Sequence, residues 1–283
     1  MINHSVKAIL ESELNEKIIQ LPIGSGKLIT ESGRIFFLKS GSTSRTYQCE
    51  ANGLKELKKS GKIRIADIIS VGNNYILTEY IESGSHSSGF FDSFGRAFAR
   101  MHKYTADCFG FYENNYIGAN EQLNIPDENE KNNWIFFYFN KRLMYQYRLA
   151  EKNGFVNERL KTGFIKLESK IEDILKDSLE PPTLLHGDLW SGNFLCSLSG
   201  EAVLIDPAVY YGHREADLAM TKLFGGFPSS FYEAYRAEFP LKTGWEYREG
   251  LYKLYHVLNH LNIFGTSYLY EAEYLINQYT KNN

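Results

Sequence analysis

Three polar side chains in the second half of the sequence have the types and the spacing that phosphoryl transfer requires. Asp188 is followed five residues later by Asn193 and, thirteen residues beyond that, by Asp206. Phosphoryl transfer passes through a loose transition state, so its catalysis consists mostly of positioning and charge neutralisation. Asp188 could accept the proton of a substrate hydroxyl as a general base. The Asn193 amide and the Asp206 carboxylate offer hard oxygen ligands suited to Mg²⁺, so the set predicts a kinase that uses ATP.

Each of these residues also has an ordinary structural interpretation when it is taken alone. Asp188 could cap a helix or a turn, and Asn193 could be a turn residue. Asp206 could be a capping residue before Pro207. However, Asp188 directly follows an apolar strand, where a carboxylate can project into a cleft, and Asp206 ends the next predicted hairpin. Taken together, the three residues favour a phosphotransferase.

A kinase also needs a cation for the α- and β-phosphates and an acid that holds this cation. Lys39, at the end of a predicted strand, and Glu50, on the helix that follows, have the right spacing. Alone, Lys39 could be a solvated lysine and Glu50 a surface acid. Yet Glu50 lies three residues after Tyr47 and four before Leu54, on the apolar face of its helix, where an unpaired charge would be costly. A buried pair of Lys39 and Glu50 removes that cost.

Two weaker signals indicate where backbone groups could bind the rest of the nucleotide. Gly24, Ser25 and Gly26 lie between the first two predicted strands and could let backbone amides approach phosphates, although a plain hairpin is the alternative. The sequence has no Walker A motif with its Gly-Lys-Ser/Thr ending. Residues Glu79 to Ile81 end the last strand of the small lobe, where backbone groups would meet the adenine ring. An ordinary strand end fits that segment equally well.

Composition and charge limit the class of protein. The chain has 283 residues, 43% of them hydrophobic, which is enough for two domains or one two-lobed unit with substantial cores. A net charge of −3 and scattered Lys and Arg residues argue against a nucleic-acid partner. Three widely spaced cysteines argue against a disulfide framework and a zinc site. No apolar run approaches the ~20 residues that cross a bilayer. We therefore expect a cytoplasmic monomer with a small-molecule substrate and no membrane partner.

The first part of the chain is predicted to be rich in β-structure, because short apolar runs alternate with glycine-containing turns. The predicted strands are residues 18–23, 27–30, 34–39, 63–71 and 75–81. One helix interrupts them after the cap-forming run 42–44, with apolar residues at spacings of three and four. The polar segment 82–89 is the predicted boundary. It separates a nucleotide-binding lobe at 1–82 from a catalytic and substrate-binding lobe at 83–283.

Beyond the boundary the periodicity is mostly helical. The predicted helical segments are 91–101, 134–150, 157–175, the region from 215 onward, and 247–261. Short strands surround the candidate catalytic residues at 183–186, 194–198 and 202–205, and the last two form a hairpin. Aromatic residues make up 15% of the chain and are expected to pack in the cores rather than to stack on bases. The pattern indicates an α+β protein.

The chain as a whole resembles the fructosamine kinase, or ketosamine-3-kinase, family within the aminoglycoside-phosphotransferase-like proteins. Its most specific motifs are HGDLWSGN at 186–193, IDPAVYYGHREADLAM at 205–220 and CFGFYENNYIG at 108–118. The resemblance implies a two-lobed protein-kinase-like fold, with a small antiparallel β-rich N-lobe and a larger, mainly helical C-lobe. It also implies ATP and Mg²⁺ as cofactors. The roles it implies are Asp188 as base, Asn193 and Asp206 as magnesium ligands, and Lys39 with Glu50 as the phosphate-anchoring pair.

The resemblance also implies a substrate class. Family members phosphorylate the 3-hydroxyl of ketosamines, the ketose adducts of lysines and other amines, and the unstable product releases the amine. We expect the same deglycation activity here, on ribulosamine, erythrulosamine or fructosamine adducts. One alternative is a kinase of another hydroxylated amine, of the aminoglycoside or choline type. The other is a nucleotide-binding pseudokinase, which the intact catalytic set argues against.

Further residues are candidates for binding the substrate or supporting the catalytic loop. Kinases of aminoglycosides or choline commonly carry a polar residue at the position of Trp190, so Trp190 favours the ketosamine branch. Its indole could lie under the apolar face of a sugar, or it could be a core residue. Gln122 and Asn124 could bond to substrate hydroxyls or cap a loop. Glu215 and Asp217 are expected to brace the catalytic loop from a helix N-terminus.

Overall fold

The computed structural model describes residues 2–41 and 45–281, which divide into two compact units. The first unit comprises Met1–Phe90 and Asn193–Pro207, and the second comprises Phe91–Gly192 and Ala208–Asn283. The chain therefore leaves the first unit, returns to it for one hairpin, and ends in the second. The predicted helix cap at 42–44 lies outside the described residues. The predicted lobe boundary near residue 82 stays a prediction.

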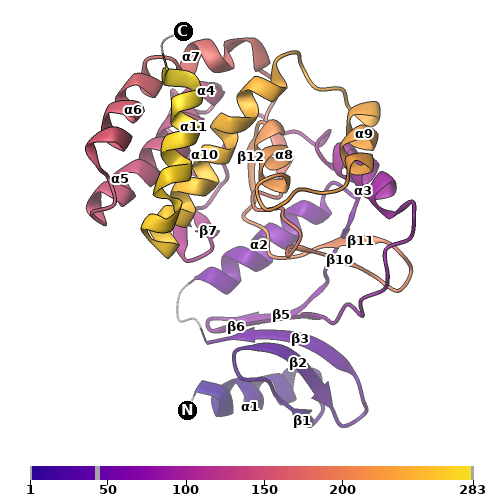
Figure 1. Ribbon diagram of the computed structural model, residues 1–283. Helices are drawn as coiled ribbons and strands as arrows, with labels where there is room; N and C mark the ends of the chain where they lie inside the picture. Colours follow the sequence, from indigo (N-terminus) through magenta and orange to yellow (C-terminus); the bar gives the residue numbers. More distant parts are fainter. Residues whose placement is uncertain (1, 42–44, 282–283) are drawn as a thin grey trace. The chain divides into compact units, whose positions relative to one another are not determined.

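A five-stranded antiparallel sheet forms the centre of the first unit, in the order β1-β2-β3-β6-β5 (Figure 1). Its strands are β1 (Ile18–Gln20), β2 (Ser25–Thr30), β3 (Ile35–Ser40), β5 (Ile68–Gly72) and β6 (Tyr75–Glu79). Side chains alternate along β3, so Phe36 and Leu38 lie in the core on one face while Phe37 and Lys39 lie on the other. One face of β3 thus packs in the core, and its other face lines a cavity.

Two helices accompany this sheet. Helix α1 (Ile2–Leu14) packs Val6 and Leu10 against the core face. We did not predict α1, because its few apolar residues stand among polar and charged ones. Helix α2 (Thr46–Lys58) follows β3, as predicted, and its Leu54 lines the same cavity as Phe37 on the opposite face.

A second, three-stranded sheet in the first unit joins distant parts of the sequence. The predicted strand 63–71 is in fact two strands, since β4 (Arg64–Ile65) separates from β5 at Ala66 and Asp67. Strand β4 pairs in parallel with β11 (Ala202–Leu204), which pairs antiparallel with β10 (Phe194–Cys196). The predicted hairpin at 194–205 is therefore present, and it brings the residues on either side of it into the first unit.

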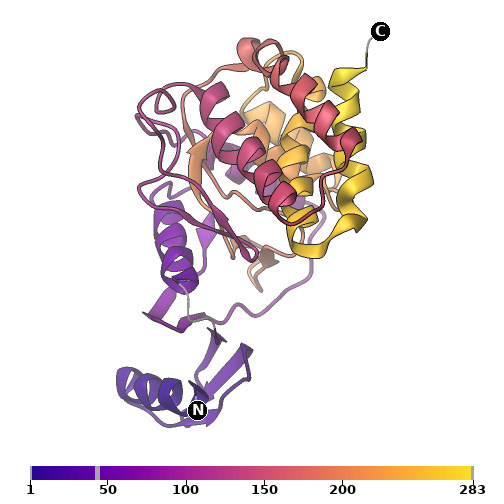
Figure 2. The ribbon, with the colours of Figure 1, turned by 90° about the vertical axis from the view of Figure 1, so that its left-hand side faces the viewer.

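The second unit is mainly helical (Figure 2). Its helices are α3 (Phe90–Met101), α4 (Trp134–Tyr138), α5 (Tyr145–Lys152), α6 (Glu158–Glu168), α7 (Ile171–Leu175), α8 (Glu215–Thr221), α9 (Ser229–Glu238), α10 (Trp245–Phe264) and α11 (Leu269–Thr280). A π-helical segment, Phe139–Met144, connects α4 to α5 where a plain helix was predicted. Helix α10 packs against α8, α5 and α11 and is almost wholly buried along one side.

Two small antiparallel pairs complete the second unit. Strand β9 (Thr183–Leu185) pairs with β12 (Tyr210–Gly212), and β7 (Asn115–Ile117) pairs with β8 (Asn120–Gln122). Most of the bulkiest buried side chains are aromatic, as predicted; Trp134, Tyr138 and Tyr252 form one cluster and Phe94, Phe98 and Phe231 another. Within the described parts of the chain, none of the helices has the length and apolar character needed to cross a membrane.

Candidate active site

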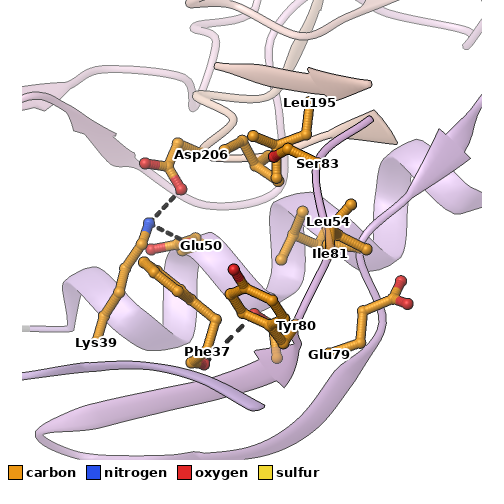
Figure 3. A pocket seen from close by; sticks show the side chains of 13 residues that line it. Phe37, Lys39, Glu50, Leu54, Glu79, Tyr80, Ile81, Ser83, Leu195 and Asp206 are labelled. Atoms are coloured by element: carbon orange, nitrogen blue, oxygen red, sulfur yellow. Dashed lines mark hydrogen bonds and ion pairs between the residues drawn. The ribbon is translucent and has the colours of Figure 1, made fainter. Parts of the chain in front are cut away.

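Lys39 bonds to two acids in the first unit. Its Nζ donates to Glu50 Oε1 at 2.8 Å and also to Asp206 Oδ1 (Figure 3). The predicted pair of Lys39 and Glu50 is therefore formed, with both side chains less than one-fifth exposed. Asp206, whose side chain is 41% exposed, joins them from the end of the β10–β11 hairpin.

The electrostatics of this cluster follow from burial and from its unequal charges. Burial alone would lower the pKa of Lys39, but the carboxylates of Glu50 and Asp206 outweigh it, so the pKa of Lys39 is raised. Burial raises the pKa of Glu50; Lys39 opposes this rise and the charge of Asp206 adds to it. The single ammonium of Lys39 thus pairs with two carboxylates. The excess of negative charge leaves the site suited to a further cation.

A cavity of about 250 Å³ opens beside this cluster, within the first unit (Figure 3). Its apolar lining comes from both sheets and from α2: Phe37, Leu54, Ala66, Ile81, Leu195 and Ile205. Lys39, Glu50 and Asp206 contribute charged groups to the same wall. An apolar slot with charged groups grouped along part of its wall is suited to a ligand with a flat ring and a phosphate chain.

Of the two segments predicted to bind the nucleotide through backbone groups, one lines the cavity and the other does not. Glu79 and Ile81 line the cavity, as expected of an adenine-contacting segment, while the Glu79 carboxylate is bound by Arg64 Nη2 at 2.8 Å. Gly24, Ser25 and Gly26 do not line it. Instead β2 begins at Ser25, directly opposite Lys39 in the strand register. The pairing of β2 with β3 therefore places the glycine segment next to Lys39, the predicted phosphate-binding lysine.

Asp206 and Asn193 belong to opposite ends of one hairpin. The backbone N–H of Ile205 donates to the Asn193 carbonyl at 3.1 Å, which places Asn193 beside the residue that precedes Asp206. Asp206 has a φ of +53°, in the left-handed region that few residues other than glycine adopt. Such conformations persist where the surroundings determine them, and they cluster at functional sites. The hairpin thus places the two predicted metal ligands at its adjacent ends, just outside its paired strands.

No cluster of three or more His, Cys, Asp or Glu side chains in residues 2–41 and 45–281 could hold a metal ion alone. This agrees with the chemistry of Mg²⁺, which protein sites usually hold with one or two carboxylates together with substrate phosphates. Asp206 is partly exposed and shares a single cation with Glu50, so the residues present fit such an ion.

The candidate base lies in the second unit, in a loop held by its backbone. After β9, the backbone N–H groups of His186 and Gly187 donate to Asp217 on α8 at 2.7 and 2.8 Å. The His186 carbonyl accepts from Ala208 N at 2.8 Å. Asp188 N contacts His186 Nδ1 at 3.3 Å. Asp217 thus braces the loop immediately before Asp188, as predicted.

Asp217 is itself held in its charged form. Burial would raise the pKa of Asp217, but hydrogen bonds from His102 and from the Gly187 N–H outweigh it and lower the pKa. His102 Nε2 lies 3.2 Å from Asp217, and its Nδ1 lies 2.7 Å from the Tyr235 hydroxyl. Because the carboxylate accepts, Nε2 carries the proton and Tyr235 donates to Nδ1. A buried chain of hydrogen bonds therefore fixes the orientation of the loop.

Comparison with known proteins decides the family. The sequence profile of the family described as "Fructosamine kinase" matches residues 2–282. The chain belongs to the fructosamine kinase family. It is 37% identical to a "Probable ketoamine kinase" of Enterococcus faecium, over 94% of this chain and 96% of that one. It is also 37% identical to a chloroplastic protein-ribulosamine 3-kinase of Arabidopsis thaliana, over 89% and 78%.

Solved structures show the same fold. A "putative fructosamine-3-kinase" of Thermobifida fusca matches with a TM-score of 0.85 and 28% identity, over 97% of this chain and 98% of that one. An ADP-bound aminoglycoside phosphotransferase shares the fold at a TM-score of 0.62 and 12% identity, over 99% and 98%. This fructosamine kinase family member therefore has a kinase-like α+β fold, and it is an ATP-dependent phosphotransferase with a hydroxyl acceptor.

Trp190 of this kinase is 38% exposed and is not a core residue. A Cβ on Gly192 would lie 2.5 Å from the indole ring, so the ring packs directly over the glycine backbone. The motif LWSGN thus needs glycine at position 192, because a side chain there would clash with the packed indole of Trp190. The exposed ring remains a candidate platform for a sugar.

Gln122 and Asn124 are buried, with 1% and 0% of their surfaces exposed. The Gln122 amide donates to Asn115 Oδ1 at 2.9 Å and its oxygen accepts from the Tyr255 hydroxyl at 2.7 Å. The Asn124 amide also donates to Asn115 Oδ1, at 2.8 Å, and its oxygen accepts from Arg142 Nη2 at 2.7 Å. Their polar atoms are engaged within the protein. These contacts favour loop support over binding of substrate hydroxyls.

Sequence reasoning missed His102, Tyr235 and Arg248. His102 directly follows α3, four residues after Phe98 of its apolar stripe, and this position indicates a buried histidine that needs a hydrogen-bond partner. Arg248 Nε and Nη2 bind Glu215 at 2.8 and 2.7 Å, so Glu215 braces α8 against α10 rather than the loop directly. Nothing in the sequence indicates which side chain each of these residues binds.

Proposed function

We propose that this kinase phosphorylates the 3-hydroxyl of ketosamines and so takes part in deglycation. The family and the related ketoamine and ribulosamine kinases support this substrate class. The observation that carries the proposal is the braced loop that presents Asp188 and an exposed Trp190 two residues apart. An acid next to an exposed aromatic platform suits a sugar hydroxyl better than an apolar acceptor.

We assign the catalytic roles as follows. Asp188 accepts the proton of the attacking hydroxyl, and Asp217 keeps the Asp188 backbone in place through the two N–H groups before it. Lys39, held by Glu50, binds the phosphates of ATP, and the apolar cavity takes the adenine ring. Asn193 and Asp206 would hold Mg²⁺, which neutralises phosphate charge when it is bound.

The substrate assignment is tested with a panel of acceptors. Mg²⁺-dependent ADP formation is measured with ribulosamine, erythrulosamine and fructosamine derivatives of lysine, free ketoses, choline and an aminoglycoside. We expect turnover with ketosamines, and a 3-phosphate product by NMR. Preference for choline or the aminoglycoside would replace the proposed substrate class. No stimulation by any acceptor would favour a binding module without turnover.

The role of Asp188 is tested with Asp188→Asn. Loss of a general base typically lowers the rate 10²- to 10⁴-fold, so kcat should fall by at least about 100-fold while the Kd of ATP stays within about threefold. Asp173→Asn, at an exposed position on α7, is the matched control. Turnover close to wild type in Asp188→Asn would contradict the role.

The cytoplasmic location and the monomeric state are also proposals. Size-exclusion chromatography with light scattering tests the second of these, and a dimer mass would overturn it.

A further inference from the structure

Five aromatic side chains form a continuous row in the second unit, which we call the aromatic row. Its members are Trp190, Phe224, His260, Phe264 and Tyr268. Ring centroids are 6.0 Å apart for Trp190 and Phe224 and 5.1 Å apart for Phe224 and His260. His260 stacks on Phe264 at 5.5 Å and on Tyr268 at 5.2 Å. The row therefore connects the catalytic loop with the C-terminal end of α10.

The row is exposed where a structural cluster would be buried. Phe224 is 40% and Phe264 is 62% exposed, in addition to the exposed Trp190. Aromatic side chains are costly to leave in water, and a contiguous exposed group of them commonly marks a binding site. Because Trp190 follows Asp188 by two residues, the row begins at the place where the reacting hydroxyl must lie.

His260 adds one specific polar group to the row. Its Nδ1 lies 2.7 Å from the His256 carbonyl, which can only accept, so Nδ1 carries the proton. Burial lowers the pKa of His260, so the ring is neutral and Nε2 is an acceptor. Among the residues that the structure describes, none forms a hydrogen bond with Nε2. The row thus combines π faces with one hydrogen-bond acceptor.

We propose that the aromatic row binds the protonated amine of the ketosamine and the alkyl chain attached to it. The inference rests on the proposed function, because a ketosamine joins a sugar to a secondary ammonium. Aromatic faces attract an ammonium within about 6 Å of a ring centroid, and His260 Nε2 accepts one of its N–H groups. The methylenes of a lysine chain pack on Phe264 and Tyr268. The row selects an aminated sugar over the free ketose.

Two dead-end analogues without the 3-hydroxyl test this selection. One is the 3-deoxy ketosamine of hexylamine, and the other is its 1-O-alkyl ether, which has the same shape without the cation. Inhibition constants for both are measured against a ketosamine substrate. The wild type should bind the amine at least about tenfold more tightly than the ether. Phe224→Ala and His260→Ala should weaken binding of the amine roughly tenfold and that of the ether less than threefold.

Tyr270→Ala is the matched control, since Tyr270 is a 73% exposed aromatic residue on α11 outside the row. It should leave both constants unchanged. Equal binding of amine and ether by the wild type, or equal losses in the Phe224 variant, would overturn the inference. The ketosamine kinase assignment would survive that result. If the wild type turned over no ketosamine, the proposed function would fail. Calorimetric binding of hexylammonium to the wild type and to Phe224→Ala would then test by itself whether the aromatic row binds an ammonium.

Discussion

Lys39 is the central residue of the proposed nucleotide site, because its ammonium pairs with two carboxylates at once. Glu50 is the more buried of the two acids, and its pKa is raised by that burial. Asp206 is more exposed and reaches the cluster from a distant part of the chain. Glu50 therefore positions the lysine, whereas Asp206 remains accessible to a ligand.

The first prediction concerns Glu50→Gln. Removing its charge leaves Lys39 bound to Asp206 alone, so the lysine should be drawn away from the phosphates. We expect the KM for ATP to rise about tenfold, with a smaller fall in kcat, in steady-state assays. Glu56→Gln, on the same helix and paired with Lys59, is the control. Equal KM values in the two variants would show that Glu50 does not position Lys39.

At the residue scale, the types and spacing of single residues were enough to predict most of the candidate site. Lys39 and Glu50 were predictable as a pair because a charge on an apolar helix face needs a partner. The burial of Gln122 and Asn124 was not predictable, since their partners Asn115, Arg142 and Tyr255 come from separate elements. A polar residue near a motif has the same sequence appearance whether it faces a ligand or a core.

At the scale of elements, the loop that carries the proposed base Asp188 is a short connection fixed from two sides. Asp217 on α8 holds two of its N–H groups, and the Gly187 backbone approaches Ala208 closely. A Cβ on Gly187 would lie 1.9 Å from the Ala208 carbonyl oxygen, and Gly187 has a φ of +83°. The loop can take this course only with glycine at this position.

Gly187→Ala should therefore lower the free energy of unfolding by more than the cost of its left-handed backbone, because the added Cβ also clashes with Ala208. A left-handed conformation costs a non-glycine residue about 1–2 kcal/mol. Gly154→Ala is the control, because Gly154 has a φ of +74° and its added Cβ would meet no atom within 4 Å. Urea unfolding should show a loss at Gly187 at least about 2 kcal/mol larger than that at Gly154. Equal losses would contradict the close approach.

Element prediction succeeded where periodicity and turn residues agree and failed where long-range pairing decides. Strands β1, β2, β3 and β6 of the five-stranded sheet and helix α2 were predictable from local pattern. The division of 63–71 into β4 and β5 was not, because β4 pairs with β11, far along the chain. The π-helical segment Phe139–Met144 was hidden as well, since one extra residue in a helical turn leaves no local signal.

At the scale of the whole molecule, buried histidines make stability depend on pH. Burial lowers the pKa of His102, His213 and His256, the last to about 3 from 6.5. The unfolded chain therefore binds more protons than the folded protein below pH 6.5. Stability is full above that pH and is lost as the pH falls toward the folded pKa values.

We expect the melting temperature to fall between pH 7 and pH 5. His256 alone should account for about 2 kcal/mol at pH 5, given 1.36 kcal/mol per pKa unit. Scanning calorimetry of the wild type and His256→Gln measures this, with His86→Gln at an exposed position as the control. The variant should show a shallower decline than both the wild type and the control. If the melting temperature fell equally with pH in all three proteins, His256 would not be a cause of the pH dependence.

The return of the chain to the first unit has a consequence for how the protein is made. Ala66 and Ile81 form a small apolar cluster with Val203 of β11, and β4 has its strand partner in the same hairpin. During synthesis these surfaces stay uncovered until the ribosome has added residues up to Pro207. The N-terminal segment therefore cannot complete the first unit by itself, and a fragment ending at Phe90 should be captured by chaperones rather than fold.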